Sequence, residues 1–109
     1  MLPPLSPAAD AMTDFSPFAN RLGKNIKHRL KWAKRLQLEA WRAYDRDVPQ
    51  FPFAVDIYGD HAHVQEYDTG WLMSPADHRR WLEGAVEAVA FVCGFPNQNC
   101  LLYTSDAAD

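Results

Sequence analysis

Hydrophobic and polar residues first follow a helical period from about Pro17 to about Gln37. Drawn at 100° per residue, this segment gathers its apolar residues on one side and its cations on the other. The apolar side holds Phe18, Leu22, Ile26, Leu30, Ala33 and Leu36. Ser16, as an N-cap, and Pro17, in the first turn, form a typical helix start. The pattern therefore predicts an amphipathic helix over this range.

The period then changes to that of strands. Residues 40–44 have the aromatic content of a short strand, and the acidic, proline-containing segment 45–49 interrupts it. Apolar and polar positions alternate over 53–58 and again over 61–67, with Gly59 and Asp60 between them. Alternation on both sides of such a turn predicts a β-hairpin with one buried face.

A second helical pattern begins after Ser74. Ser74, Pro75 and Asp77 supply an N-cap, a first-turn proline and an acidic third residue, and Gly94 predicts the end at about Cys93. The apolar face holds Leu82, Ala85, Val86, Val89, Ala90 and Val92. The predicted fold is α+β, in the order helix, strand, hairpin, helix.

Charge is distributed unevenly along the chain. The formal net charge is -3, yet residues 15–38 contain seven Lys or Arg and no Asp or Glu. Six of these cations are the candidate site residues: Arg21, Lys24, Lys27, Lys31, Lys34 and Arg35. Such segregation favours a partner rich in phosphate, such as RNA. A merely solvated helix face and an anionic membrane surface are the alternatives.

Length and composition limit the classes of function. With 109 residues, the chain forms one domain at most. No apolar run is long enough to span a bilayer. The apolar side of the first helix has only one large aromatic residue at its start, so we place nucleic acid ahead of a membrane surface and expect no membrane partner. The two cysteines, Cys93 and Cys100, have no metal-ligand spacing, and a reducing cytoplasm is the expected location. No phosphate-binding loop, nucleophile elbow or other catalytic motif occurs, so no catalytic, cofactor-binding or metal-binding residue is predicted.

Several polar residues have both a chemical and a structural interpretation. Asp45 and Asp47 could bind a cation or share acid and base roles, but the favoured interpretation is a turn in which they accept backbone hydrogen bonds. His61 and His63 share a strand face without an evident third metal ligand. Asp56, in an apolar strand, is expected to pair with a cation such as Arg42.

Aromatic residues offer a second route to RNA. Unpaired bases stack on exposed aromatic side chains in single-stranded RNA binders. The candidates are Trp41, Tyr44, Phe51, Phe53, Tyr58 and Tyr67. In so small a domain most of them must form the core, and we expect no more than two to be exposed.

Five blocks of the chain together resemble one family. They are Phe18–His28, Lys31–Arg35, Tyr44–Pro49, Ala54–Asp60 and Val64–Tyr67. In this order they are similar to the bacterial SAM-dependent ribosomal RNA methyltransferases, in particular to the guanine-N7 methyltransferase module of the bifunctional large-subunit (23S) enzyme. The chain departs from that module at residues 50–53 and 68–71, which favours a single-module relative.

The resemblance implies a function and an architecture. In the family these blocks form an accessory part that precedes a Rossmann-like methyltransferase domain, and that part is thought to engage RNA. The full-length parent would transfer a methyl group from S-adenosyl-L-methionine (SAM) to a guanine of large-subunit rRNA. The SAM site would lie beyond this fragment, which would bind RNA without catalysis. A non-enzymatic RNA- or ribosome-binding module is the main alternative, and a domain that binds an acidic protein is a further one.

These inferences divide the chain into four parts. Residues 1–16 are expected to be a disordered leader, residues 17–73 the RNA-binding helix with its β-unit, and residues 74–99 a helix leading toward the missing catalytic domain. Residues 100–109 resemble the translation of a sequencing adapter and are expected to be foreign to the natural protein. Without Asp106 and Asp109 the net charge would change from -3 to -1.

Overall fold

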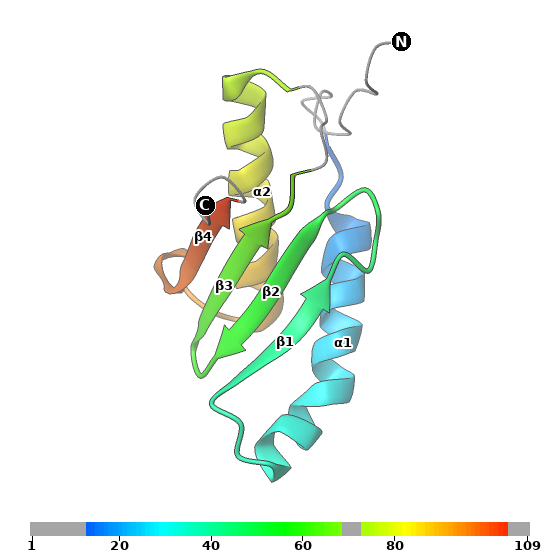
Figure 1. The fold of residues 1–109 in the computed structure, drawn as a ribbon, viewed down its shortest axis with the longest axis vertical. Coiled ribbons are helices and arrows are strands. Elements are labelled where there is room, and N and C mark those ends of the chain that lie inside the picture. The colour runs from blue at the N-terminus through cyan, green and yellow to red at the C-terminus, as the bar shows by residue number, and fades with distance from the viewer. Residues whose placement is uncertain (1–12, 69–72, 105–109) are drawn as a thin grey trace.

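The computed structural model describes residues 13–68 and 73–104, and these form two helices and four strands (Figure 1). The leader up to residue 12, the segment 69–72 and the tail from residue 105 lie outside the described residues. In chain order the elements are α1 (Ser16–Arg35), β1 (Ala40–Asp45), β2 (Phe53–Tyr58), β3 (His61–Glu66), α2 (Pro75–Cys93), the short 3-10 helix η2 (Asn97–Asn99) and β4 (Cys100–Thr104).

The elements form two layers. The sheet has the order β1-β2-β3-β4, with antiparallel pairing between the first three strands and parallel pairing between β3 and β4. Both helices cover the same face of the sheet, and no described helix lies on the other face (Figure 1). The predicted α+β class is confirmed. Among the described residues, no helix is both long enough and apolar enough to cross a bilayer.

The second helix was predicted closely. The Ser74 hydroxyl accepts a hydrogen bond from the Asp77 amide at 3.1 Å, so Ser74 is the N-cap. The helix ends at Cys93, because Gly94 adopts the left-handed conformation with φ of 73°, which glycine tolerates without a steric penalty. The hairpin is also confirmed, with pairs from Phe53↔Glu66 to Tyr58↔His61.

The first helix differs from the prediction at both ends. Ser16 is its first residue and makes no cap; instead the Asp14 carboxylate accepts a hydrogen bond from the Ser16 amide at 2.9 Å. The helix stops at Arg35 rather than Gln37, because Gln37 has φ of 55°, outside the helical region. The Leu38 amide then returns to the Ala33 carbonyl at 3.0 Å and closes the last turn.

The hydrophobic core lies between the helices and the covered face of the sheet. Phe18 and Leu22 from α1 meet Trp81 from α2 over Val55 and Val64 of the sheet, all of them buried. Phe15 also joins this core, with its ring centroid 5.2 Å from that of Trp81. The folded part therefore begins before residue 17, and the leader predicted to reach residue 16 is too long at its end.

Strand β4 was not predicted. Cys100–Thr104 pairs in parallel with β3, from Ala62↔Cys100 to Glu66↔Thr104. The connection through α2 returns the chain to the same edge of the sheet, as parallel pairing requires. Residues 100–104 thus occupy an edge strand in this structure, whereas their origin from a sequencing adapter stays a prediction.

Candidate nucleic-acid interface

The six cations singled out in the sequence all lie exposed on α1, and we call them the basic stripe: Arg21, Lys24, Lys27, Lys31, Lys34 and Arg35. Phe18, Leu22 and Ala33, on the opposite side of the helix, are buried. The predicted amphipathic arrangement is confirmed over most of its length. Across residues 13–68 and 73–104, no salt bridge joins a stripe cation to a carboxylate.

The apolar side of α1 is covered only in part. Leu30 and Leu36 were predicted to face the core but are 37% and 53% exposed. The reason is geometric, because the C-terminal end of α1 extends beyond the end of α2 (Figure 1). Consequently no second helix covers this end of the apolar stripe.

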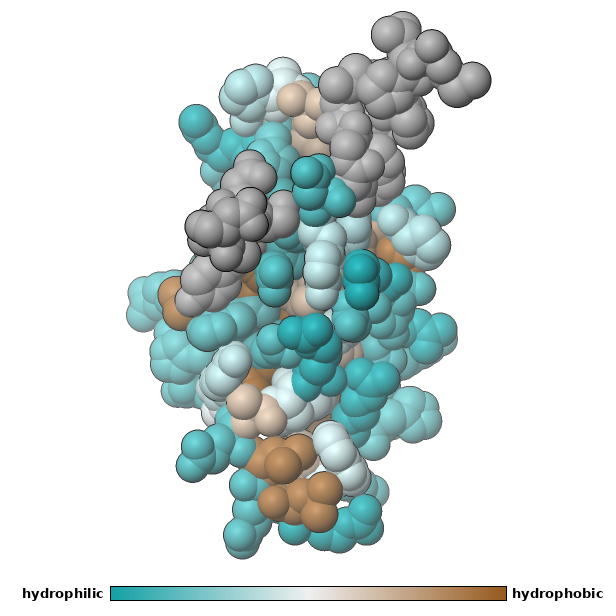
Figure 2. Space-filling model, viewed as in Figure 1, coloured by the Kyte–Doolittle hydropathy of each residue, from teal (hydrophilic) through white to brown (hydrophobic). Residues whose placement is uncertain are grey.

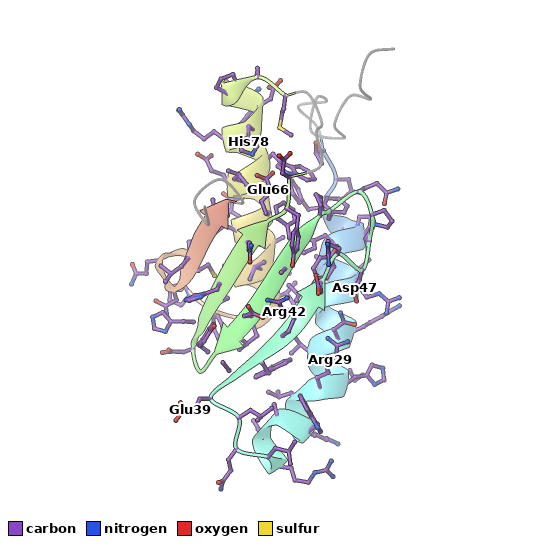
Figure 3. The ribbon with its side chains drawn as sticks, viewed as in Figure 1. Arg29, Glu39, Arg42, Asp47, Glu66 and His78 are labelled. Carbon is purple, nitrogen blue, oxygen red and sulfur yellow. The ribbon has the colours of Figure 1, made fainter. Side chains whose placement is uncertain are left out.

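Two polar side chains of α1 fix its position on the sheet. Asn25 is buried, and its amide donates to the Ala43 carbonyl and to the Asp47 carboxylate, both at 2.9 Å. One nitrogen of the Arg29 guanidinium donates to the carbonyls of Arg42, at 3.2 Å, and Ala43, at 3.3 Å. Ala43 lies at an irregularity in the β1–β2 register, which leaves its carbonyl available to the helix. Figure 3 shows Arg29 and Asp47 along this contact between α1 and β1.

Asp47 is the carboxylate on which these contacts converge. Burial acts to raise its pKa, but hydrogen bonds from the Asp45 amide and the Asn25 side chain, with the charges of Arg29 and Arg21, lower the pKa overall. The hydrogen bond from the Asp45 amide to the Asp47 carboxylate measures 3.0 Å. The turn interpretation of Asp47 is therefore confirmed.

The same turn is closed by a buried phenol. The Tyr44 hydroxyl donates to the Phe51 carbonyl at 2.7 Å and accepts from the Val48 amide at 3.1 Å. Burial raises the pKa of Tyr44 to about 12. Tyr44 therefore serves the structure and offers no stacking surface to a ligand.

The uncovered face of the sheet is mainly hydrophilic (Figure 2). Arg42 donates two hydrogen bonds to the Asp56 carboxylate, at 2.8 and 3.0 Å, which confirms the expected ion pair. Tyr58 packs against His63, with ring centroids 4.4 Å apart, and His61 contacts the Asp60 carboxylate at 2.7 Å. Among the described residues, no three or more His, Cys, Asp or Glu side chains group as a metal site would require.

Most of the aromatic candidates are structural, as expected. Tyr44, Phe51 and Phe53 are buried, Trp41 and Tyr67 are half-buried, and Tyr58 is exposed. The Arg46 guanidinium covers one face of Tyr67, at 4.1 Å from the ring centroid. Of the six, Tyr58 is the aromatic ring most open to solvent.

A groove at the end of α1 was missed in the sequence. It is open to solvent, has a volume of about 470 Å³ and is lined by Arg29, Trp32, Leu38, Ala40, Trp41 and Arg42. Trp32 was not among the aromatic candidates, although it is 43% exposed. The sequence did contain a sign that Trp32 would be exposed: it lies at the border between the apolar and basic sides of the helix, where an aromatic ring cannot be fully buried.

Among the described residues, no glycine lies where a nucleotide-binding loop would need it; residues 69–72, between β3 and α2, lie outside the described residues. Nucleotide cofactors bind where a glycine-containing turn joins a strand to the N-terminus of a helix. The described glycines lie elsewhere: Gly23 and Gly84 inside helices, Gly59 in the hairpin turn and Gly94 after the end of α2. Burial raises the pKa of the Cys93 thiol to about 11, which leaves little reactive thiolate at neutral pH.

Comparison with known proteins identifies relatives at the level of sequence. The chain is 70% identical over 84 residues to the ribosomal RNA large subunit methyltransferase K of Neisseria meningitidis. The matched segment covers 77% of this chain and 24% of that protein. It is 41% identical over 85 residues to the methyltransferase K/L of Pseudomonas aeruginosa, covering 78% of the chain and 12% of the relative. A methyltransferase K/L of Pseudomonas putida is 38% identical over 101 residues, and the match covers 93% of this chain and 14% of the relative. No family model matches the chain.

These relatives confirm the resemblance seen in the five sequence blocks. The chain is homologous to a segment of the large subunit rRNA methyltransferases K and K/L. It spans about a quarter or less of the relatives it matches.

Proposed function

From its homology to part of the large subunit rRNA methyltransferases, we propose that this chain is the RNA-docking part of such an enzyme. The parent transfers a methyl group from SAM to a guanine of 23S rRNA, in the cytoplasm where that RNA is made. We assign the cofactor and the chemistry to the part of the relatives that this chain does not span. The chain alone should bind RNA without methylating it.

The observation that carries the RNA-docking role is the basic stripe. Four of its lysines, Lys24, Lys27, Lys31 and Lys34, are spaced three or four residues apart, so neighbours on the helix surface repel one another. With no described carboxylate paired to them, a ligand with several phosphates would relieve this repulsion. Contacts of this kind position an RNA without reading its sequence.

The fold supports this role by holding the stripe rigidly. Asn25 and Arg29 anchor the middle of α1 to the bulged strand β1, while the stripe cations point away from the core. The side chains that bind RNA and the side chains that fix the helix are therefore different residues. Charge changes at the lysines of the stripe can be made without removing a described ion pair or side-chain hydrogen bond of the fold.

Salt dependence tests the proposal first. If about five cations contact phosphates of a single-stranded RNA, its affinity should fall roughly a hundredfold between 50 and 200 mM salt. We would measure this by fluorescence anisotropy with a labelled RNA of about 20 nucleotides. An affinity that does not change with salt would contradict phosphate binding by the stripe.

A pair of charge-reversed variants tests where the RNA binds. Lys24→Glu with Lys31→Glu changes the stripe, and Arg79→Glu with Arg80→Glu makes the same change in net charge on α2. The stripe variant should lose most RNA binding, whereas the α2 variant should keep most of it. If both variants lost the same RNA affinity, the loss would be due to the change in net charge alone, and the stripe would not be the binding site.

The same variants connect the chain to methylation in the complete parent enzyme. The stripe variant should lower methylation of large-subunit rRNA in cells, measured by mass spectrometry of the rRNA, and should leave SAM affinity unchanged. Normal methylation with the stripe reversed would refute a role of this surface in substrate docking.

A further inference from the structure

The groove at the end of α1 combines exposed aromatic surface with fixed positive charge. It lies where α1 ends and β1 begins, and Trp32 and Trp41 both line it. Hydrophobic residues also remain exposed around it, among them Leu36 at 53% and Leu38 at 39%. Figure 2 shows hydrophobic side chains at this end of the molecule, in an otherwise mainly hydrophilic face. This surface is open in the folded chain.

The two charged side chains that line the groove, Arg29 and Arg42, are both cations, and Arg42 is paired with Asp56. Along the helix, Arg29 and Arg35 lie three residues before and three residues after Trp32, so they flank its side chain on the helix surface. Glu39, the carboxylate of the segment that joins α1 to β1, is exposed and in Figure 3 points away from Arg29.

The two arginines are held in place by the fold. Arg29 donates to the backbone carbonyls of Arg42 and Ala43, and Arg42 is paired with Asp56. A ligand entering the groove therefore meets guanidinium groups whose positions are already fixed, which lowers the entropic cost of binding. An apolar protein segment would have to remove water from the Arg29 guanidinium without offering it a counter-charge.

We propose that this groove binds one unpaired base of an RNA whose phosphates follow the basic stripe. The inference rests on the proposed function and adds a site to it. A base stacks on the exposed face of Trp32, and the adjoining phosphates lie toward Lys31, Lys34 and Arg35, in the last two turns of the same helix. Such stacking accepts any base, because every base has an aromatic face. The preferred ligand is therefore single-stranded or looped RNA rather than a continuous duplex.

The size of the groove agrees with this ligand. The groove is open to solvent and has a volume of about 470 Å³, which suits a base that stacks by one face rather than a ligand that is enclosed. Loss of a base-stacking residue weakens binding by about 1–3 kcal/mol, which corresponds to roughly 5- to 150-fold in affinity.

The test compares two RNAs of equal length and charge, one with all its bases and one with abasic positions at its centre. Trp32→Ala should weaken binding of the complete RNA by roughly 5- to 150-fold and leave the abasic RNA unchanged. Trp32→Phe should retain most of the affinity. Phe91→Ala, which removes another exposed aromatic ring, 86% exposed on α2, should bind both RNAs normally.

The outcomes separate this site from the proposed function. If the unmodified chain binds both RNAs equally and Trp32→Ala changes neither, the groove is not a base site while the stripe still binds phosphates. If the unmodified chain binds neither RNA, both proposals fail. Photocrosslinking of 5-bromouridine RNA to the unmodified chain gives a readout that does not depend on folding of the variant. A crosslink at Trp32 or Trp41 supports the site, and crosslinks confined to α2 would overturn it.

Discussion

Gly84, in the middle of α2, should respond to substitution in a way that reveals the packing of the first ordered residues. A β-carbon at position 84 would lie 2.6 Å from Phe15 Cζ and closer still to Phe15 Cε2. The Phe15 ring has little room to move, because its centroid is 5.5 Å from that of Phe51 and 5.2 Å from that of Trp81. Gly84→Ala must therefore displace a partly buried aromatic ring that packs against the core.

Two opposing effects decide the sign of the change in stability. Alanine in a helix interior is favoured over glycine by about 1 kcal/mol. Overpacking of a core costs about 1–3 kcal/mol. We expect the second effect to prevail and Gly84→Ala to lower the free energy of unfolding by about 1 kcal/mol.

Gly23, in the interior of α1, is the matched control. A β-carbon there would lie 3.7 Å from Val92 Cγ1, which is an ordinary van der Waals distance. Gly23→Ala should therefore raise the free energy of unfolding by about 0.5–1 kcal/mol. The same substitution in two helices of this chain thus has opposite predicted signs.

A double-mutant cycle with Phe15 isolates the cause. Phe15→Ala removes the ring, so Gly84→Ala in that background should stabilise the protein as Gly23→Ala does, with a coupling energy of about 2 kcal/mol. Urea unfolding, followed by tryptophan fluorescence and by far-UV circular dichroism, gives the free energy of unfolding of the unmodified chain, the two single variants and the double variant. If Gly84→Ala stabilises the unmodified chain as much as Gly23→Ala does, the packing of Phe15 against α2 is refuted.

Two further substitutions test the contacts that define α1. The folded state lowers the pKa of Asp47 below its ordinary value of 3.8, so its stabilising contribution is complete above that pH and is lost as pH falls through the lowered pKa. Below about pH 4, the free energy of unfolding of Asp47→Asn should therefore fall less steeply with decreasing pH than that of the unmodified chain. If the two proteins lose stability in parallel, the Asp47 carboxylate does not contribute in this way. Gln37→Gly should raise the free energy of unfolding by about 0.5–1 kcal/mol, because φ of 55° strains residues with a β-carbon; thermal or urea unfolding that shows destabilisation would contradict this.

The elements that could be predicted from the sequence are those specified by local chemistry. Ser74, Asp77 and Gly94 define the two ends of α2 by side-chain capping and by a left-handed glycine, and neither device depends on distant residues. The β-hairpin follows from alternation on both sides of a short turn. The pairing of Asp56 with Arg42 could be expected because a carboxylate in an apolar strand needs a partner.

The features that could not be predicted depend on contacts between elements. Helical periodicity showed that Leu30 and Leu36 share a face with Phe18, but it could not show that the second helix ends before it reaches them. The burial of Asn25, a polar residue, depends on the irregular register of β1, which leaves a carbonyl for its side chain. The groove beside Trp32 has the same origin, since it depends on where α1, the connecting segment and β1 meet.

The arrangement of α1 would let one helix serve both stability and the RNA docking that we propose. Its N-terminal half is held by the core through Phe18 and Leu22, and its middle is held by the hydrogen bonds of Asn25 and Arg29. The last two turns extend past the second helix, with exposed apolar side chains on one side and cations on the other. Because the anchored half fixes the direction of the free half, RNA binding at the free end need not order the helix. The cost of association is then mainly that of ordering the RNA, which favours a segment that is already single-stranded in its target.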